Sequence, residues 1–557
     1  MNKEVCICND PVHGWHGLEL NGSPCCFRGF VIIDNVISEG EDAAIAVVKL
    51  LGGETRRERI TSLLQSLKGD FAFFVERSDA IIAVVDKIRS FPIFFSHEGK
   101  RLLLGNSARL LREKLPQAAF DQNGLLEFQM TGFVTEQNTL RQGVKQLRPG
   151  ECLYFDKASV ENVETWRYRS FYTPEKEEKS EDEWLAEFDA VNEETFQDVI
   201  RSLKGRPVWV PLSGGLDSRL VVAMLKHQGY DRVTAFSYGL PGNYQAEVAR
   251  RVAGKLGVKW LFIPYTHQVT RKRFREEKRK EYFAYADGLC SVPFLSDYYA
   301  LAHLREKKII DPDAVIINGQ SGDFITGGHI PEFRGQGEVN WRNFLVESII
   351  NKHFSLWSDL KSKENIGWAE RRLADHFGAF PEPKGPQDVA DLFEHWEWQE
   401  RQSKYVVNGQ RAFEFFGYDW RLPLWSDQYF DFWQKVPWQH KMNQSLYKKY
   451  LRKKDPMGVF SMELPAYYVS PRYLLLFSLL VSIAARFNRQ SKLVLENRFL
   501  KYFMYYGPFY SYLTYRQYLN HSDYHRNVVS FLVYEVLKNA GDECLSLVAP
   551  QRRSLMS

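Results

Sequence analysis

The chain has 557 residues, of which 44% are hydrophobic and 25% are charged. This balance excludes a disordered, collagen-like or coiled-coil protein, and the length predicts two to four domains. The formal net charge of +4 is too small to indicate a nucleic-acid-binding protein, which usually concentrates basic residues on one face.

The first 165 residues are predicted to form strands with one or two helices. Stretches rich in β-branched and aromatic residues, bounded by Gly, Asp and Pro, predict strands at 27–38, 69–76, 80–86 and 93–95. Apolar residues that recur every three or four positions predict helices at 41–51 and 57–67. A charged stretch without an apolar anchor follows at 173–183, and we interpret it as a solvated linker.

Beyond this linker the pattern changes to alternating strands and helices. Strands are predicted at 207–212, 233–238, 260–264 and 315–318. The first three are separated by helical stretches at 219–228 and 247–256. This alternation is typical of parallel βαβ units, so the fold class is α/β. From about residue 340 onward the chain is predicted to be mostly helical and aromatic.

The most specific motif is SGGLDS at 213–218, which joins a predicted strand to a predicted helix. Backbone N–H groups and the positive end of the helix would converge there on an anion. The two serines add hydroxyl donors, the glycines let a phosphate approach the backbone, and Asp217 can hold Mg²⁺. The motif lacks the GK[ST] ending of a Walker loop. It is similar to the pyrophosphate loop of the N-type ATP pyrophosphatases, although a plain strand–helix turn is the competing interpretation.

Three further strings follow in order: NGQSGDFITGGH at 318–329, RLPLWSD at 421–427 and KKYLR at 448–452. Together with SGGLDS they resemble the asparagine synthetase family. The strings LKGDFAF at 67–73 and DKIRSFPIF at 86–94 resemble the family's glutaminase half. The resemblance covers most of residues 1–452. It implies an N-terminal Ntn-like α+β sandwich followed by a parallel-sheet α/β ATP pyrophosphatase domain with a helical C-terminal extension.

The resemblance also implies the domain boundaries and the site. We expect a degenerate glutaminase-like domain at 1–165, a linker at 166–185, a synthetase-type domain at 186–460 and an aromatic-rich extension at 461–557. The residues expected to bind ATP are Leu212, Ser213, Gly214, Gly215, Leu216, Asp217, Ser218, Ser237, Gly319 and Gly322. The expected catalytic residues are Asp323, Gln320, Lys448 and Lys449, and the expected Mg²⁺ ligands are Asp217 and Asp323.

The implied activity is a two-step ligase reaction. ATP with Mg²⁺ would adenylate a carboxylate and release pyrophosphate, and an amine or ammonia would then attack the acyl adenylate. Charge builds up on the leaving pyrophosphate, so preorganised N–H donors and a metal are where catalysis should come from. Ser237 would hydrogen-bond the adenine, and Lys448 or Lys449 would stabilise the developing charge.

Two departures from the family pattern change this expectation. Glutamine-hydrolysing members carry Cys directly after the initiator Met, where this chain has Asn2, so we expect no glutaminase activity unless processing exposes Cys6. Gln320 stands where asparagine synthetases commonly carry Glu, and an amide cannot act as a base. We therefore expect an acceptor other than aspartate, such as a sugar acid or a polysaccharide precursor. An authentic asparagine synthetase and a non-catalytic nucleotide-binding scaffold are the alternatives.

Cysteine usage and the apolar segments bear on location and partners. The seven cysteines, an odd number without regular spacing, predict reduced thiols in a cytoplasmic protein. The longest apolar run, at 473–485, is shorter than the roughly 20 residues that span a bilayer, so we expect a buried helix there. The aromatic segment at 500–519 is either a helical cap or a docking surface for a glycan acceptor or a membrane surface. We expect no nucleic-acid partner, and a homodimer is a further expectation.

Overall fold

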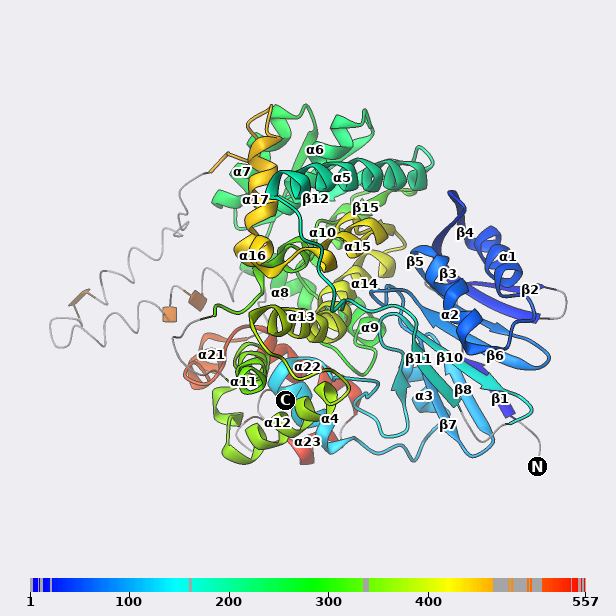
Figure 1. Ribbon diagram of the computed structural model, residues 1–557. Coiled ribbons are helices and arrows are strands. Elements are labelled where there is room, and N and C mark those ends of the chain that lie inside the picture. Colours follow the sequence, from blue (N-terminus) through cyan, green and yellow to red (C-terminus); the bar gives the residue numbers. More distant parts are fainter. Residues whose placement is uncertain are drawn as a thin grey trace.

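The computed structural model describes residues 4–8, 10, 14–20, 23–159, 163–333, 340–463, 479, 482–483, 498–499, 501–502, 513–541, 543–548, 552 and 555. The strands of the N-terminal half lie together on one side of the molecule, and the mostly helical remainder of the chain lies beside them (Figure 1). The predicted fold class is confirmed: an α+β sandwich precedes a parallel α/β sheet.

The N-terminal half contains two sheets. Its strands are β1 (Glu4–Cys8), β2 (His16–Leu20), β3 (Ser23–Ile33), β4 (Val36–Glu39), β5 (Lys68–Glu76), β6 (Ala80–Val85), β7 (Phe94–Glu98), β8 (Arg101–Gly105), β9 (Lys145–Gln146), β10 (Glu151–Asp156) and β11 (Val163–Arg167). Its helices are α1 (Gly40–Leu51), α2 (Arg57–Ser66), α3 (Ala108–Glu113) and α4 (Gln122–Thr131). One sheet has the order β11-β10-β6-β5-β3-β2, with β4 paired to β3, and the other has the order β1-β8-β7-β9.

Strand β5 shows why this half folds as layers. Phe71, Phe73 and Val75 pack in the cluster that contains the apolar residues of α1 and α2. Ala72 and Phe74 belong instead to the main core on the opposite face of the sheet. Successive side chains of a strand point to opposite faces, so a strand that is covered on both sides is apolar at every position rather than at alternate ones.

The second half is built on a parallel sheet with the strand order β14-β13-β12-β15-β16. Its elements up to the fourth strand are α5 (Glu181–Leu203), β12 (Val208–Pro211), α6 (Leu216–His227), β13 (Val233–Gly239), α7 (Tyr244–Lys255), β14 (Lys259–Pro264), α8 (His267–Arg275), α9 (Glu277–Ala286), α10 (Tyr298–Glu306) and β15 (Val315–Ile317). The carboxyl ends of these strands lie at one edge, where open α/β sheets place their ligands.

A long helical insertion separates β15 from the last strand, β16 (Asp419–Arg421). It comprises η2 (Phe324–Gly328), α11 (Trp341–His353), η3 (Ser358–Leu360), α12 (Lys363–Phe377), α13 (Pro386–Glu397), η4 (Trp398–Val406), η5 (Val407–Gln410) and α14 (Arg411–Phe415). After β16 come η6 (Pro423–Trp425), α15 (Asp427–Lys435), α16 (Trp438–Lys441), η7 (Met442–Gln444) and α17 (Ser445–Lys453).

The segment predicted as a solvated linker is more ordered than its charge suggests. Lys176 pairs with Asp391 at 2.8 Å, and the two side chains are only 12% and 9% exposed. Helix α5 begins at residue 181, where Ser180 and Glu183 form a reciprocal capping box. The charged composition therefore reflects ion pairs and a helix N-terminus, where acidic side chains are stabilising.

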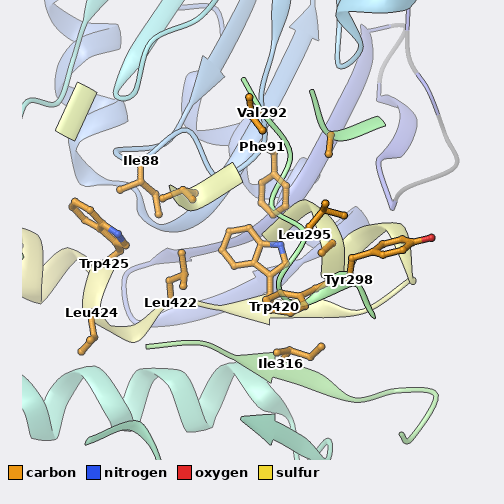
Figure 2. Packing of buried hydrophobic residues seen from close by; sticks show 14 of the residues in the cluster. Ile88, Phe91, Val292, Leu295, Tyr298, Ile316, Trp420, Leu422, Leu424 and Trp425 are labelled. Carbon is orange, nitrogen blue, oxygen red and sulfur yellow. The ribbon is translucent and has the colours of Figure 1, made fainter. Parts of the chain in front are cut away.

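The two halves share one core. Trp420 of β16 lies next to Phe91 of the N-terminal half, with ring centroids 5.3 Å apart (Figure 2). Polar contacts cross the same boundary: the Asp427 carboxylate accepts hydrogen bonds from Gly69 N at 2.8 Å and from Lys87 Nζ at 3.1 Å. The relative position of the two halves is therefore fixed by packing and by buried ion pairs.

The described parts of the C-terminal region include α21 (Tyr515–Asn520), α22 (Val529–Ala540) and α23 (Cys544–Leu547). Helix α22 packs on both α4 and α9, and the Trp357 indole donates to Ser530 O at 3.1 Å. Most of the segments 473–485 and 500–519 lies outside the described residues, so their predicted roles stay predictions. Within the part of the chain that the structure describes, no helix is both long and apolar enough to cross a membrane. Within the described residues, no disulfide joins any of the seven cysteines.

Candidate active site

The SGGLDS loop connects β12 to α6 and is organised by its own serines. Ser213 N donates to Ser218 Oγ at 3.1 Å, and the two hydroxyl oxygens lie 3.2 Å apart. Gly215 N donates to Ser213 Oγ at 3.1 Å. The N-cap residue of α6, Gly215, has no side chain that could cap the helix, and the N–H groups of a first helical turn have no partner inside the helix. The loop is therefore a preformed cradle for an anion.

The second Gly-rich loop, at 318–323, follows β15 and packs directly on the first. A Cβ added at Gly322 would lie 2.4 Å from Asp217 Cγ, and one at Gly319 would lie 2.8 Å from the Asp217 carbonyl carbon. Both positions require glycine because no side chain fits between the two loops. This contact places Asp217 near Asp323, at the carboxyl ends of two neighbouring parallel strands.

Asp217 is a carboxylate in an unfavourable environment. Burial raises its pKa to about 7, and the negative charge of Asp323 adds to the shift. The Tyr447 hydroxyl donates to Asp217 Oδ1 at 2.9 Å and opposes the shift. Two carboxylates that repel one another are a donor set that suits Mg²⁺, since this ion prefers oxygen ligands and would neutralise both charges. Asp217 and Asp323 therefore fit the predicted metal.

Asp323 is tied to a buried acid through one histidine. His329 Nε2 lies 3.2 Å from Asp323 Oδ2, and His329 Nδ1 lies 2.5 Å from Glu397 Oε1. Burial would raise the pKa of Asp323, but the hydrogen bond and charge of His329 lower it below its ordinary value. The histidine therefore keeps Asp323 ionised and holds its orientation.

Glu397 is the centre of a cationic cluster beside the second loop. Its carboxylate lies 3.0 Å from Lys352 Nζ, 3.4 Å from an Arg401 nitrogen and 3.5 Å from His353 Nε2. Burial would raise the pKa of Glu397, but the charges and hydrogen bonds of His329 and His353 hold it well below its ordinary value. The cluster surrounds one buried anion with cations at the edge of the site.

Known protein families match two regions of the chain. Residues 194–454 match asparagine synthase, and residues 56–168 match the glutamine amidotransferase domain. The chain has the architecture of the asparagine synthetase family. The two matches contain both Gly-rich loops and most of the N-terminal sandwich, and they support an ATP-dependent amidotransferase-type ligase.

Individual proteins add little to this family assignment. No curated protein matches the chain. One similar solved structure is glutamine phosphoribosylpyrophosphate amidotransferase from B. subtilis, complexed with ADP and GMP. It shows 12% identity and a TM-score of 0.19, over 65% of this chain and 78% of the other. A second is an allosteric regulatory enzyme of purine biosynthesis, with 12% identity and a TM-score of 0.19, over 68% and 80%. Superpositions this poor carry no argument.

Gln320, which stands at a common Glu position of asparagine synthetases, lies in a neutral pair. The Gln410 amide donates to Gln320 Oε1, and Gln320 N donates to Asn318 Oδ1 at 3.1 Å. A Cβ added at Gly409 would lie 3.5 Å from the Gln320 amide, so η5 covers this side chain. The pair orients hydrogen-bonding groups but supplies no base.

Two other predicted roles find little support in the geometry. The Ser237 hydroxyl donates to Leu212 O at 2.6 Å and accepts from the Trp260 indole at 2.9 Å, so it is engaged inside the fold rather than held ready for adenine. Lys448 Nζ donates to Asn443 O.

The other lysines of the same helix turn away from the loops. Lys449 pairs with Glu181, and Lys453 and Lys454 pair with acidic residues of α5. The buried face of α17 is formed by other residues, namely Leu446, Tyr447, Tyr450 and Leu451. The structure thus brings Asp217, Asp323 and the glycines together, but neither Lys448 nor Lys449 joins them.

Sequence analysis missed Tyr447, His329 and Glu397. Tyr447 directly precedes the KKYLR string, and His329 is the last residue of the second Gly-rich string. Both residues therefore lie in or beside the recognised strings, but neither was predicted to have a role. The helical period carried a signal for Tyr447, because it shares the apolar face of α17 with Leu451 four residues on. Glu397 had little signal, since only Arg401 is near it in the chain, while His329, Lys352 and His353 come from distant segments.

A second group of potential metal ligands has carboxylates that are already paired with cationic side chains. Single ligand atoms of Glu136, His376 and Glu400 lie within 4.8 Å of one another. Arg148 pairs with Glu136 at 2.8 Å, and Lys404 pairs with Glu400 at 2.6 Å. These cations occupy the carboxylates that a metal would need, so the group is a buried ion-pair network.

Proposed function

We propose that the protein adenylates a carboxylate and then joins the activated acyl group to an amine. The observation that carries this proposal is the direct contact between the two Gly-rich loops, which places Asp217 near Asp323 at the mouth of an anion-binding turn. Such a site stabilises charge that develops on pyrophosphate as it leaves.

In the first step a carboxylate oxygen of the acceptor attacks the α phosphorus of ATP. The bond to the bridging oxygen of the β phosphate breaks, and pyrophosphate leaves. The N–H groups at the start of α6 and the hydroxyls of Ser213 and Ser218 lie where the phosphates would bind. Asp217 and Asp323 would hold Mg²⁺, which supplies Lewis-acid stabilisation of phosphate charge.

In the second step the amine nitrogen attacks the acyl carbon and AMP leaves. One amine proton must be lost, and Gln320 cannot take it because an amide is not a base. Gln410 Oε1, beside Gln320, is buried without a hydrogen-bond partner among the described residues. That oxygen is suited to accept an N–H of the incoming amine and so to orient it.

The acceptor in this proposal is a carboxylate other than aspartate, with a sugar acid or a polysaccharide precursor as the favoured class. The neutral Gln320–Gln410 pair supports a different acceptor or amine, since a carboxylate at position 320 would steer a cationic amine and take its proton. The amine is proposed to come from solution, because the N-terminal half has Asn2 where a Cys nucleophile would stand.

A pyrophosphate-release assay with candidate acids tests the reaction class. AMP and pyrophosphate are the expected products, whereas ADP and orthophosphate would overturn adenylation. Asp217→Asn should lower the rate by about 10³-fold, since losing a metal ligand removes several kcal/mol of transition-state stabilisation. Asp182→Asn is the matched control, because Asp182 is exposed at the start of α5. Conversion of aspartate alone would favour an authentic asparagine synthetase. No turnover with any acid, despite ATP binding, would favour a scaffold.

A further inference from the structure

A cavity of about 360 Å³ lies between the two halves of the protein, and no residue of either Gly-rich loop lines it. The N-terminal half contributes Trp15, Arg89 and Phe94 to its lining, and the second half contributes Cys290 and Arg411, among others. Volumes of this size, with a mainly apolar and aromatic lining and a few polar groups, are typical of small-molecule sites.

Arg89 is a buried cation that has no counter-ion among the described residues. Its side chain lines the cavity and the residue is 2% exposed. Its guanidinium donates to Leu147 O at 3.1 Å and lies 3.9 Å from the Cys290 sulfur. No carboxylate of the described residues lies within 4.0 Å of it. Burial lowers the pKa of Arg89, and the charge of Arg411 lowers it further. A buried guanidinium that is not neutralised destabilises the folded protein.

Arg411 adds a buried hydrogen-bond donor that lacks an acceptor among the described residues to the lining of the same cavity. Arg411 is 4% exposed. Its Nη2 donates to Glu414 Oε1 and to Ser90 O, each at 2.6 Å. Its Nε is buried and has no hydrogen-bond partner among the described residues. A buried N–H without an acceptor is rare in native proteins and calls for an explanation.

The backbone at Arg89 is also strained. Its φ of +56° lies in the left-handed region, which glycine adopts freely and arginine adopts only at a free-energy cost. Strain of this kind persists where the surrounding structure imposes it, and it holds the guanidinium at the cavity wall.

The other charged residues of the lining do not neutralise Arg89. Arg109 is paired with Asp287. Asp10 and Glu281 also line the cavity but are not buried, and neither lies within 4.0 Å of the Arg89 guanidinium. Among the described residues, the lining therefore holds one buried cation with no carboxylate within 4.0 Å, Arg89, and one buried N–H without an acceptor, on Arg411.

We propose that this interface cavity binds a small organic carboxylate, with its anionic group on Arg89 and Arg411 and its apolar body against Trp15, Phe94 and Phe415. Arg guanidinium groups recognise carboxylates by paired hydrogen bonds, and the aromatic lining favours a ligand with an apolar body. The site is separate from the ATP loops but next to the ligase: Asn408 lines the cavity, and its neighbour Gly409 packs against Gln320.

Calorimetric titration of the full chain with benzoate tests the proposal, with benzamide as the uncharged isostere and phenyl phosphate as the phosphate-bearing probe. We expect one saturable site for benzoate at millimolar concentrations or below, and at least about tenfold weaker binding of benzamide. Tighter binding of phenyl phosphate than of benzoate would overturn the assignment to carboxylates. So would no saturable binding of benzoate, or equal binding of benzamide.

The variant Arg89→Gly tests whether benzoate binds in this cavity. Glycine adopts the left-handed backbone of position 89 without strain, and the substitution removes the guanidinium. It should weaken benzoate binding about tenfold or more. The variant Arg112→Gln is the matched control. Arg112 lies in α3 and pairs with Glu543 at the surface, so this variant should bind benzoate within about twofold of the unmodified protein. Hydrogen exchange of the unmodified protein needs no variant: benzoate should slow exchange in α3 and α9, which line the cavity. Unchanged affinity in Arg89→Gly, or slowed exchange confined to other elements, would place the ligand elsewhere and refute the proposal.

Discussion

Lys87 Nζ lies 3.1 Å from Asp427 Oδ2, although 340 residues separate the two in the chain. Their side chains are 2% and 7% exposed, and Asp70 Oδ1 lies 3.6 Å from the same ammonium. Lys87 also donates to Gly69 O at 2.8 Å. One buried cation therefore connects the N-terminal sheet to the start of α15.

Replacing this cation should destabilise the whole molecule. Lys87→Met removes the ammonium and leaves Asp427 and Asp70 buried together, which we expect to lower the free energy of unfolding by about 3–5 kcal/mol. Urea unfolding followed by circular dichroism measures the change. The double variant Lys87→Met/Asp427→Leu should recover part of the loss, since replacing both partners removes the uncompensated charge. A single variant as stable as the unmodified protein would contradict this role.

Asp70 should make stability depend on pH. Burial raises its pKa to about 7, while in the unfolded chain it lies near 4. Between these values the folded protein binds a proton that the unfolded chain releases, so the free energy of unfolding falls as pH rises from about 4 to 7. Asp70→Asn should reduce this slope by up to about 1.4 kcal/mol per pH unit. Urea unfolding at pH 5 and pH 7 checks it, and Asp182→Asn should keep the original slope.

Gly322→Ala should abolish ligase activity, because its methyl group would lie 2.4 Å from Asp217 Cγ and force the two loops apart. We expect a loss of at least about 10²-fold in pyrophosphate release, of the size seen when catalytic groups are displaced by an ångström. Gly254→Ala, in α7, is the matched control. A Cβ there meets nothing within 4 Å, so activity should be kept and stability should rise by about 0.5–1 kcal/mol. Full activity in Gly322→Ala would refute the loop contact.

Tyr447→Phe should weaken the ligase without unfolding it. The variant loses only the hydroxyl that donates to Asp217 Oδ1 at 2.9 Å. A hydrogen bond to a charged group contributes about 1.5–3 kcal/mol, so a 10- to 100-fold decrease in kcat/KM for pyrophosphate release is expected. Tyr450→Phe removes an equivalent bond, to Asp189 at 2.9 Å, one turn along the same helix. Similar losses in both variants would indicate that α17 acts only as structure.

Glutamine should not be hydrolysed. Cys6 lies inside β1, paired in register with Leu103 of β8, and it carries no free α-amine as encoded. A thiol attacks an amide only with a nearby base. Release of glutamate from glutamine should therefore stay at background while ammonia supports the ligase. Labelling of Cys6 by a glutamine-mimicking electrophile, in a chain that begins at Cys6, would overturn this expectation.

The central pair of the site was predictable because its determinants are local. Asp217 and Asp323 each follow a Gly-rich exit from a parallel strand, and parallel strands present these exits at one edge. Lys448 and Lys449 were predicted from the KKYLR string, and such a string does not determine which face of the helix they occupy. The apolar residues of α17 define its buried face, and the lysines lie outside it, where charged side chains are solvated.

The contacts between the halves were not predictable from one sequence. A lysine such as Lys87 is expected at the surface unless it is paired, and its partner Asp427 is far away in the chain. The cationic cluster around Glu397 has the same character, since Lys352 and His353 come from α11 and His329 from the second loop. Only the folded topology brings such groups together.

The packing of α22 on α4 has a consequence for how the protein is made. Val529 packs against Gly132 just past the end of α4, and Trp357 lies against Phe531 and Tyr534 of α22. Roughly 400 residues are translated between α4 and α22. At a translation rate of 5–20 residues per second, about 20–80 s pass between the synthesis of α4 and that of α22. The apolar surface against which α22 packs stays uncovered during this time. During that interval the nascent chain presents a site for chaperones, and the N-terminal half completes its burial only after almost the entire chain has emerged.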